Sequence, residues 1–130
     1  MTISRKQAEM KAEEIKDILA PLLNKRLKYE PQVLERSDGG NRKYYKVTWL
    51  ALGIRTFAAV NMRGHLTIHK SPRENMVKVT YEQHLKNLEG NGFDIEADVH
   101  GAVNNRYIRW DIPNLREFIN FQFEYYTQDM

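Results

Sequence analysis

The spacing of apolar and polar residues at the start of the chain is typical of an amphipathic helix. Over residues 4–20 the apolar side chains fall on one helical face and the acidic side chains on the opposite face. Ser4 and Gln7 have the spacing of a capping box, in which each side chain closes a hydrogen bond in the first turn. Pro21 lacks a backbone N–H, so we expect the helix to bend or end there.

The pattern then changes to segments rich in β-branched and aromatic residues, separated by glycine-containing turns. Short turns join antiparallel neighbours, so these segments predict a four-strand antiparallel meander. Pro31 cannot donate to a strand ladder, which places the first strand at an edge. The predicted strands cover residues 29–35, 43–51, 55–62 and 65–69.

A short helix and a hairpin follow the meander. Thr80 and Gln83 have the capping spacing again, and Gly90 is expected to end this helix. Residues 93–100 then alternate strictly between apolar and polar side chains, which predicts a strand with two distinct faces. Pairing with residues 105–112 through a loop at 101–104 would set Glu96 opposite Arg109, Ile95 opposite Trp110 and Ala97 opposite Ile108.

The last segment predicts a helix that opens at Pro113 and has an unusually wide apolar face, covering an arc of about 200°. One interpretation is burial between the sheet and the first helix. The alternative is an intermolecular contact, either a homodimer or a docking face, because Tyr and Phe are enriched at interfaces. The residues assigned to that partner interface are Phe118, Phe121, Tyr125 and Tyr126.

Together these elements predict an α+β fold in one domain covering residues 1–130. The sheet is mostly antiparallel, a four-strand meander plus a C-terminal hairpin, and it is packed by an N-terminal helix, a short middle helix and a C-terminal helix. A length of 130 residues fits a single core.

Composition narrows the function classes. The chain has no cysteine, which excludes disulfides, thiolate metal sites and thiol nucleophiles. It has no glycine-rich nucleotide-binding motif. No apolar stretch resembles a signal peptide or a membrane span, so we expect a soluble cytoplasmic protein without a membrane partner. We predict no cofactor, no metal ligand and no catalytic residue, and therefore expect a non-enzymatic protein.

Charge is distributed unevenly behind a net charge of only +3. Residues 1–80 hold sixteen Lys or Arg and eight Asp or Glu, whereas residues 81–130 hold four and nine. The positive excess lies in residues 25–73, with eleven basic residues against three acidic ones. A basic sheet interleaved with aromatic residues favours contact with nucleic acid, with a nucleic-acid-handling partner or with an acidic protein surface. The candidate nucleic-acid or anion-binding residues are Arg36, Arg42, Lys43, Lys46, Arg55, Arg63, Lys70 and Arg73.

A more ordinary interpretation stands beside this one. Tyr45, Trp49 and Phe57 would be core residues, and the basic residues would be solvated side chains of turns. The functional alternatives are a protein–protein module, such as an inhibitor, an adaptor or a homodimer, that uses the aromatic C-terminal helix, or a metal-dependent hydrolase.

The hydrolase would use Asp94, Glu96 and Asp111. In the expected register Asp94 lies opposite Asp111, and two close carboxylates favour a divalent cation between them. However, this tract has no catalytic lysine, and a simpler reading pairs Glu96 with Arg109 and lets Asp111 cap the last helix. His65 and His69 would lie about 13 Å apart on a strand, too far to share a zinc ion.

Overall fold

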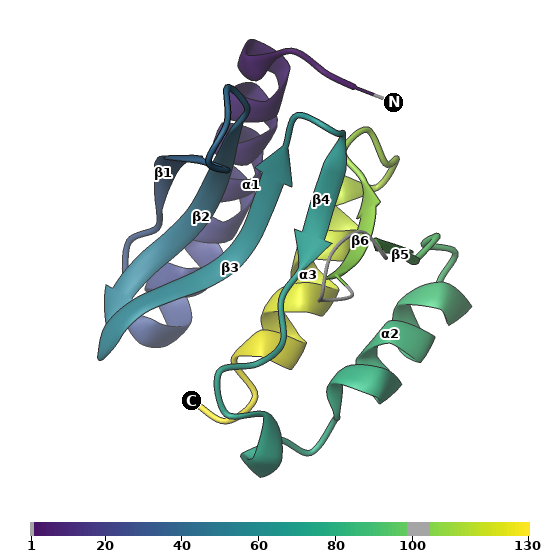
Figure 1. Ribbon diagram of the computed structural model, residues 1–130. Helices are drawn as coiled ribbons and strands as arrows, with labels where there is room; N and C mark the ends of the chain where they lie inside the picture. The colour runs from purple at the N-terminus through teal and green to yellow at the C-terminus, as the bar shows by residue number, and fades with distance from the viewer. Residues whose placement is uncertain (1, 99–104) are drawn as a thin grey trace.

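The computed structural model describes residues 2–98 and 105–130, and in these residues it has three α-helices and a six-stranded antiparallel sheet (Figure 1). The strand order is β1-β2-β3-β4-β6-β5. The predicted α+β class is therefore confirmed. The elements are α1 (Arg5–Leu27), β1 (Gln32–Ser37), β2 (Lys43–Ala51), β3 (Gly53–Asn61), β4 (His65–Ile68), a short 3₁₀ helix (Glu74–Met76), α2 (Tyr81–Gly90), β5 (Glu96–Asp98), β6 (Asn105–Arg109) and α3 (Leu115–Tyr126).

The first four strands form the predicted meander, with β1 at the edge. Each strand pairs with its sequence neighbour in antiparallel orientation. Gly53 and Gly64 lie at the two tight turns with φ of 92° and 80°, which glycine adopts without steric cost. The chain then leaves the sheet through α2 and returns through β5 and β6, and β6 pairs with β4. The hairpin thus extends the meander into one continuous sheet.

Helix α1 does not end at Pro21, which was one of the two outcomes expected there. The helix continues through Pro21 to Leu27. Leu19 and Leu23, on either side of the proline, are both fully buried, so the packing of this face outweighs the one backbone hydrogen bond that proline removes. At the other end, the capping box is confirmed, because Ser4 Oγ accepts from Gln7 N–H and Gln7 Oε1 accepts from Ser4 N–H.

The end of α1 offers a simple stability test. Lys28 caps the helix in the left-handed region, with φ of 62°, and its N–H donates to the Asn24 carbonyl. A side chain is disfavoured in this conformation and glycine is not, so Lys28→Gly should raise the free energy of unfolding by about 0.5–1 kcal/mol. Urea denaturation measures the change. Lys28→Ala is the control, because it removes the charge but keeps the steric cost. An equal gain in both variants would contradict the backbone explanation.

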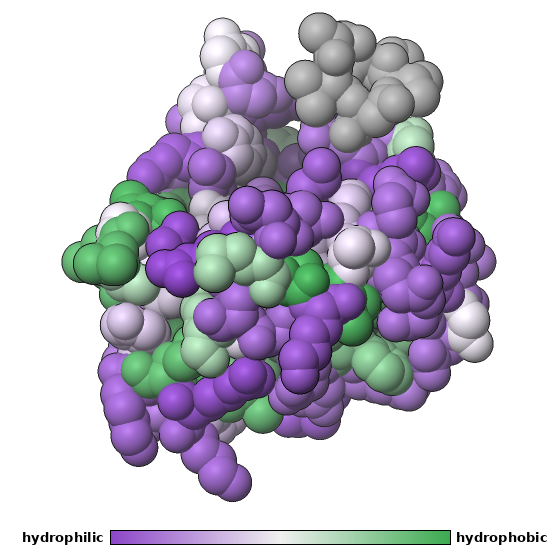
Figure 2. Space-filling view, turned by 90° about the horizontal axis from the view of Figure 1, so that it is seen from below, coloured by the Kyte–Doolittle hydropathy of each residue, from purple (hydrophilic) through white to green (hydrophobic). Residues whose placement is uncertain are grey.

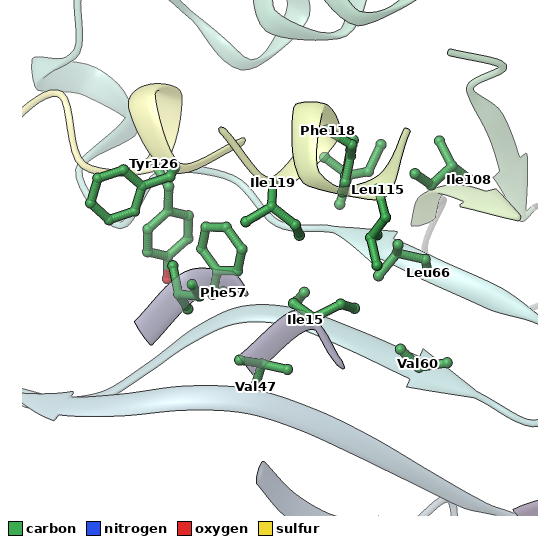
Figure 3. Close-up of a cluster of buried hydrophobic side chains, with 14 of the residues drawn as sticks. Ile15, Val47, Phe57, Val60, Leu66, Ile108, Leu115, Phe118, Ile119 and Tyr126 are labelled. Atoms are coloured by element: carbon green, nitrogen blue, oxygen red, sulfur yellow. The ribbon is translucent and has the colours of Figure 1, made fainter. Parts of the chain in front are cut away.

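Helices α1 and α3 cover the same face of the sheet, and the core lies between them and the strands (Figures 1 and 3). Tyr45, Trp49 and Phe57 are all buried there. The Tyr126 ring of α3 meets the Trp49 ring edge-on, with centroids 5.4 Å apart. These three sheet aromatics are therefore core residues, as the more ordinary interpretation expected.

Helix α3 is also packed on a second side. It begins at Leu115 rather than at Pro113, because the backbone of Asn114 is in the left-handed region and cannot be part of the helix. No side chain caps this end of the helix. His84 of α2 stacks on Tyr125 with the ring centroids 4.1 Å apart, and its Nε2 donates to Gln122 Oε1 at 2.7 Å. Contacts with the sheet, α1 and α2 together explain why the apolar arc of this helix is so wide.

This packing shows where the four residues assigned to a partner interface lie. Phe118, Tyr125 and Tyr126 have exposed fractions of 1%, 4% and 3%. Phe121 is partly buried, with its ring 6.3 Å from that of Phe93. Most of this surface is therefore occupied within the chain, which favours the core interpretation of α3.

The expected register of the C-terminal hairpin is wrong by two residues. Glu96 lies opposite Tyr107 rather than Arg109, and Ala97 lies opposite Arg106 rather than Ile108. A shift of two preserves the face of every side chain, so the alternating pattern could not distinguish the two registers. Pairing with β4 decides the position of β6, because Leu66 opposite Ile108 puts both side chains in the core. Val99, His100 and the loop at 101–104 lie outside the described residues.

Candidate nucleic-acid interface on the open face of the sheet

The sheet face opposite α1 and α3 carries no helix and is turned toward the viewer in Figure 1. Strand alternation places the side chains that are not in the core on this face. Lys46 of β2 lies opposite Ala59 of β3, which in turn lies opposite Thr67 of β4. Thr67 is opposite Tyr107 of β6. We call this surface the open face.

A hollow of about 420 Å³ lies on the open face, at the end where the β1–β2 and β3–β4 turns meet. It has the size of a small-molecule site and combines basic, aromatic and uncharged polar side chains with two carboxylates, Asp38 and Asp98. Its lining includes Arg42, Tyr44, Asn61, Arg63, Thr67 and His69.

Four of the eight predicted binding residues lie at this face, and one of these, Arg63, is paired with Asp98. Arg42 and Arg63 line the hollow. Lys46 Nζ lies 5.9 Å from the centre of the Tyr44 ring, a cation–π distance. Arg36 is opposite Tyr44 in the β1–β2 register, and its side chain is exposed. A cluster of this kind attracts an anionic ligand.

The other four predicted residues are differently placed. Lys43 lines the hollow, but its ammonium lies 4.0 Å from a carboxylate oxygen of Glu35. Arg55 lies opposite Trp49, on the helix side of the sheet. Burial raises the pKa of Tyr126, and the positive charge of Arg55 offsets part of that increase. The two remaining residues lie near the C-terminus and α2. Lys70 Nζ is 5.3 Å from the Tyr81 ring, and Arg73 is 3.8 Å from Asp129.

Aromatic side chains that the sequence analysis did not assign to the site also lie on the open face. His65 and Tyr107 stack with their ring centroids 3.6 Å apart and their planes 14° from parallel. The Tyr107 hydroxyl donates to Glu96 at 2.7 Å, which fixes the ring and raises the pKa of the phenol. Strand alternation around buried Leu66 was the signal that could have placed His65 here, but Tyr107 required the register of the hairpin.

The basic meander and the acidic hairpin meet at one point of this face. Arg63 donates to Asp98 at 3.0 Å, and His65 Nδ1 lies 3.9 Å from the same carboxylate oxygen. Burial lowers the pKa of His65, and the Asp98 carboxylate offsets part of this effect. The two charged regions therefore contact each other beside the hollow. Arg36 of β1 and Lys46 of β2 lie elsewhere on the open face.

His69 also lines the hollow. Burial, with a smaller effect of the positive charge of Lys46, lowers its pKa to about 4. Its imidazole is therefore neutral near pH 7. Within the described residues, its Nε2 has no hydrogen-bond partner. The sequence analysis considered His69 only as a zinc ligand and did not assign it to the site.

Two of the three carboxylates of the hydrolase hypothesis, Glu96 and Asp111, are engaged by neighbouring side chains. Arg109 donates from Nε and Nη2 to both oxygens of Asp111, each at 3.0 Å, and this lowers the pKa of that carboxyl. Asp94 precedes β5 and does not pair with Asp111 in the sheet, although both line a second hollow of about 420 Å³. In residues 2–98 and 105–130, no three His, Asp or Glu side chains are grouped so that they could hold a metal ion.

A separate apolar feature lies at the tip of the β2–β3 hairpin. Leu50, Leu52 and Ile54 have exposed fractions of 64%, 85% and 59%. Seen from below, the surface is largely hydrophilic, and the apolar residues form separate groups on it (Figure 2). This tip is the most apolar exposed turn in the described part of the chain and lies at the opposite end of β2 and β3 from the hollow.

Comparison with known proteins leaves the site to be interpreted from its own geometry. No protein-family model, curated protein or solved structure matches this chain. None of the described helices is long and apolar enough to cross a membrane.

Proposed function

We propose that this protein binds single-stranded nucleic acid on the open face of its sheet. The observation that carries the proposal is the gathering of basic and aromatic side chains on a sheet face that no helix covers. Arg36, Arg42 and Lys46 supply charge for phosphates, and Tyr44 and the stacked His65–Tyr107 pair supply ring surfaces for bases.

A single strand fits this surface better than a duplex. The aromatic rings on the open face lie on a sheet rather than on a protruding helix, and bases stack on such rings only when they are not paired inside a helix. The open face offers neither a helix nor a free ribbon that could enter a major groove. Every nucleotide has a phosphate and a base that can stack, so binding through charge and stacking should depend only weakly on sequence along most of the strand.

The binding test compares the wild type with a variant that removes charge only from the open face. Arg36→Gln, Arg42→Gln and Lys46→Gln together should lower the affinity for an oligonucleotide of about 12 nucleotides at least about tenfold at about 50 mM salt. The slope of log K against log salt should fall by about 2, because each phosphate contact on a single strand contributes about 0.7. Fluorescence anisotropy measures both quantities.

A matched control removes the same number of charges from the helices. Lys25→Gln, Lys86→Gln and Arg116→Gln are exposed positions on α1, α2 and α3, away from the open face. This variant should retain most of the wild-type affinity. Equal loss in both variants would mean that only net charge matters, and no binding at about 50 mM salt would refute the proposal. In that case a protein contact through the apolar hairpin tip becomes the better explanation.

A further inference from the structure

We propose that the hollow around His69 is a pocket for a single nucleotide of the bound strand, with the base against His69 and a phosphate on Arg42 and Arg63. This inference rests on the proposed function. It adds one subsite with a base preference to a surface on which binding otherwise depends on charge and stacking.

His69 has a buried ring nitrogen with an unmet hydrogen bond. The His69 side chain is partly exposed and lines the hollow, and its buried Nε2 has no partner among the described residues. Buried polar atoms are nearly always paired in folded proteins, so an unpaired one that borders a hollow is open to a water or to a ligand group. The His69 carbonyl is already held by Gln122 Nε2 at 3.0 Å, which fixes the backbone beneath the ring.

The uncharged polar groups of the hollow suit an uncharged polar ring rather than a phosphate. His69 is neutral near pH 7, so it offers a nitrogen donor or acceptor without charge. Asn61 Oδ1 accepts from the N–H groups of Arg63 and His65 at 3.0 and 3.1 Å, which orients the side chain and leaves Nδ2 as a donor. Thr67 adds a hydroxyl that can donate or accept. Such groups match the edge of a nucleobase.

The lining of the hollow also carries charge, with Arg42, Lys43 and Arg63 against Asp38 and Asp98, an excess of one basic side chain. Arg42 and Arg63 are both part of its lining, and Tyr44 adds a ring surface. Arg63 donates one Nη1 bond to Asp98, and a guanidinium has further N–H groups for a phosphate. The volume of about 420 Å³ falls within the range of small-ligand sites. A nucleotide in the hollow would therefore meet uncharged polar groups at its base and the guanidinium groups of Arg42 and Arg63 at its phosphate.

The experiment measures binding of the four ribonucleoside monophosphates and of four homopolymer strands by NMR and fluorescence anisotropy. We expect a monophosphate to shift the His69 ring resonances and one homopolymer to bind at least about tenfold tighter than another, the discrimination that a good pair of base contacts gives. His69→Phe keeps a planar ring but removes both nitrogens. It should reduce this preference to less than about threefold, while binding to the strands continues.

The control is the helix variant Lys25→Gln, Lys86→Gln and Arg116→Gln, because these residues are exposed and none of them lines the hollow. It should leave the base preference unchanged. His69→Gln is a second variant that retains a polar group if the phenylalanine disturbs folding, and it should alter which base is preferred.

The two proposals fail separately. If all strands bind equally and no His69 variant changes that, the pocket is refuted while the strand-binding function stands. If neither strands nor monophosphates bind, both are refuted. A monophosphate that binds with His69 dependence while strands do not would refute the strand-binding function and retain a nucleotide pocket.

Discussion

Replacing Phe118 by alanine should lower the free energy of unfolding by roughly 3–5 kcal/mol. The ring is 1% exposed and meets Phe93 edge-on at 5.7 Å, so its removal leaves a cavity that neighbouring side chains fill only in part. A typical domain is stable by about 5–15 kcal/mol, so this single change removes a large share of the total. Urea denaturation followed by tryptophan fluorescence measures the loss.

The same variant distinguishes the core from the interface interpretation of α3. If Phe118 is core, the loss of stability is independent of protein concentration. Phe121→Ala is the control, because that ring is only partly buried, and its effect should be clearly smaller. A Phe118→Ala protein that keeps its stability but changes from dimer to monomer in light scattering would restore the partner-interface hypothesis.

Lowering the pH from 7 to 5 should reduce the free energy of unfolding by about 2 kcal/mol through His69 alone. Its folded pKa is about 4 and its ordinary value is 6.5. Between these values the unfolded chain binds a proton that the folded chain does not, so the stability present above pH 6.5 is lost as the pH falls toward 4. Burial also lowers the pKa of His84, which adds to the loss in the same direction.

The check is the pH dependence of urea denaturation in the wild type and in His69→Gln. Glutamine does not titrate, so the variant should lose stability less steeply between pH 6.5 and pH 4. Identical slopes in the wild type and in His69→Gln would mean that His69 is not held neutral by the fold.

The strands of the meander could be predicted closely because their signals are local. Residues 43–51 match β2, and the turns at Gly53 and Gly64 lie where the sequence placed them. Alternation of apolar side chains assigns a strand's two faces, and a glycine with positive φ assigns its turn. The capping box at Ser4 was predictable for the same reason.

Other features depend on partners that are distant in the sequence. The hairpin register was missed by two residues, because β4 fixes the position of β6. The continuation of α1 through Pro21 depends on the burial of Leu19 and Leu23 against the sheet. Neither the pattern of the hairpin nor the proline itself contains that information.

The sequence by itself determined the α+β class, the meander and a basic region rich in aromatic residues, because periodicity and charge are properties of the local chain. Only the tertiary structure decided which of those residues share a surface. The helices cover one face of the sheet, so Trp49 and Phe57 became core, while Arg42, Lys46 and Tyr44 came to the open face with His69. Alternation divides a strand's side chains into two sets, but the packing of α1 and α3 determines which set is buried and which is free to meet a ligand.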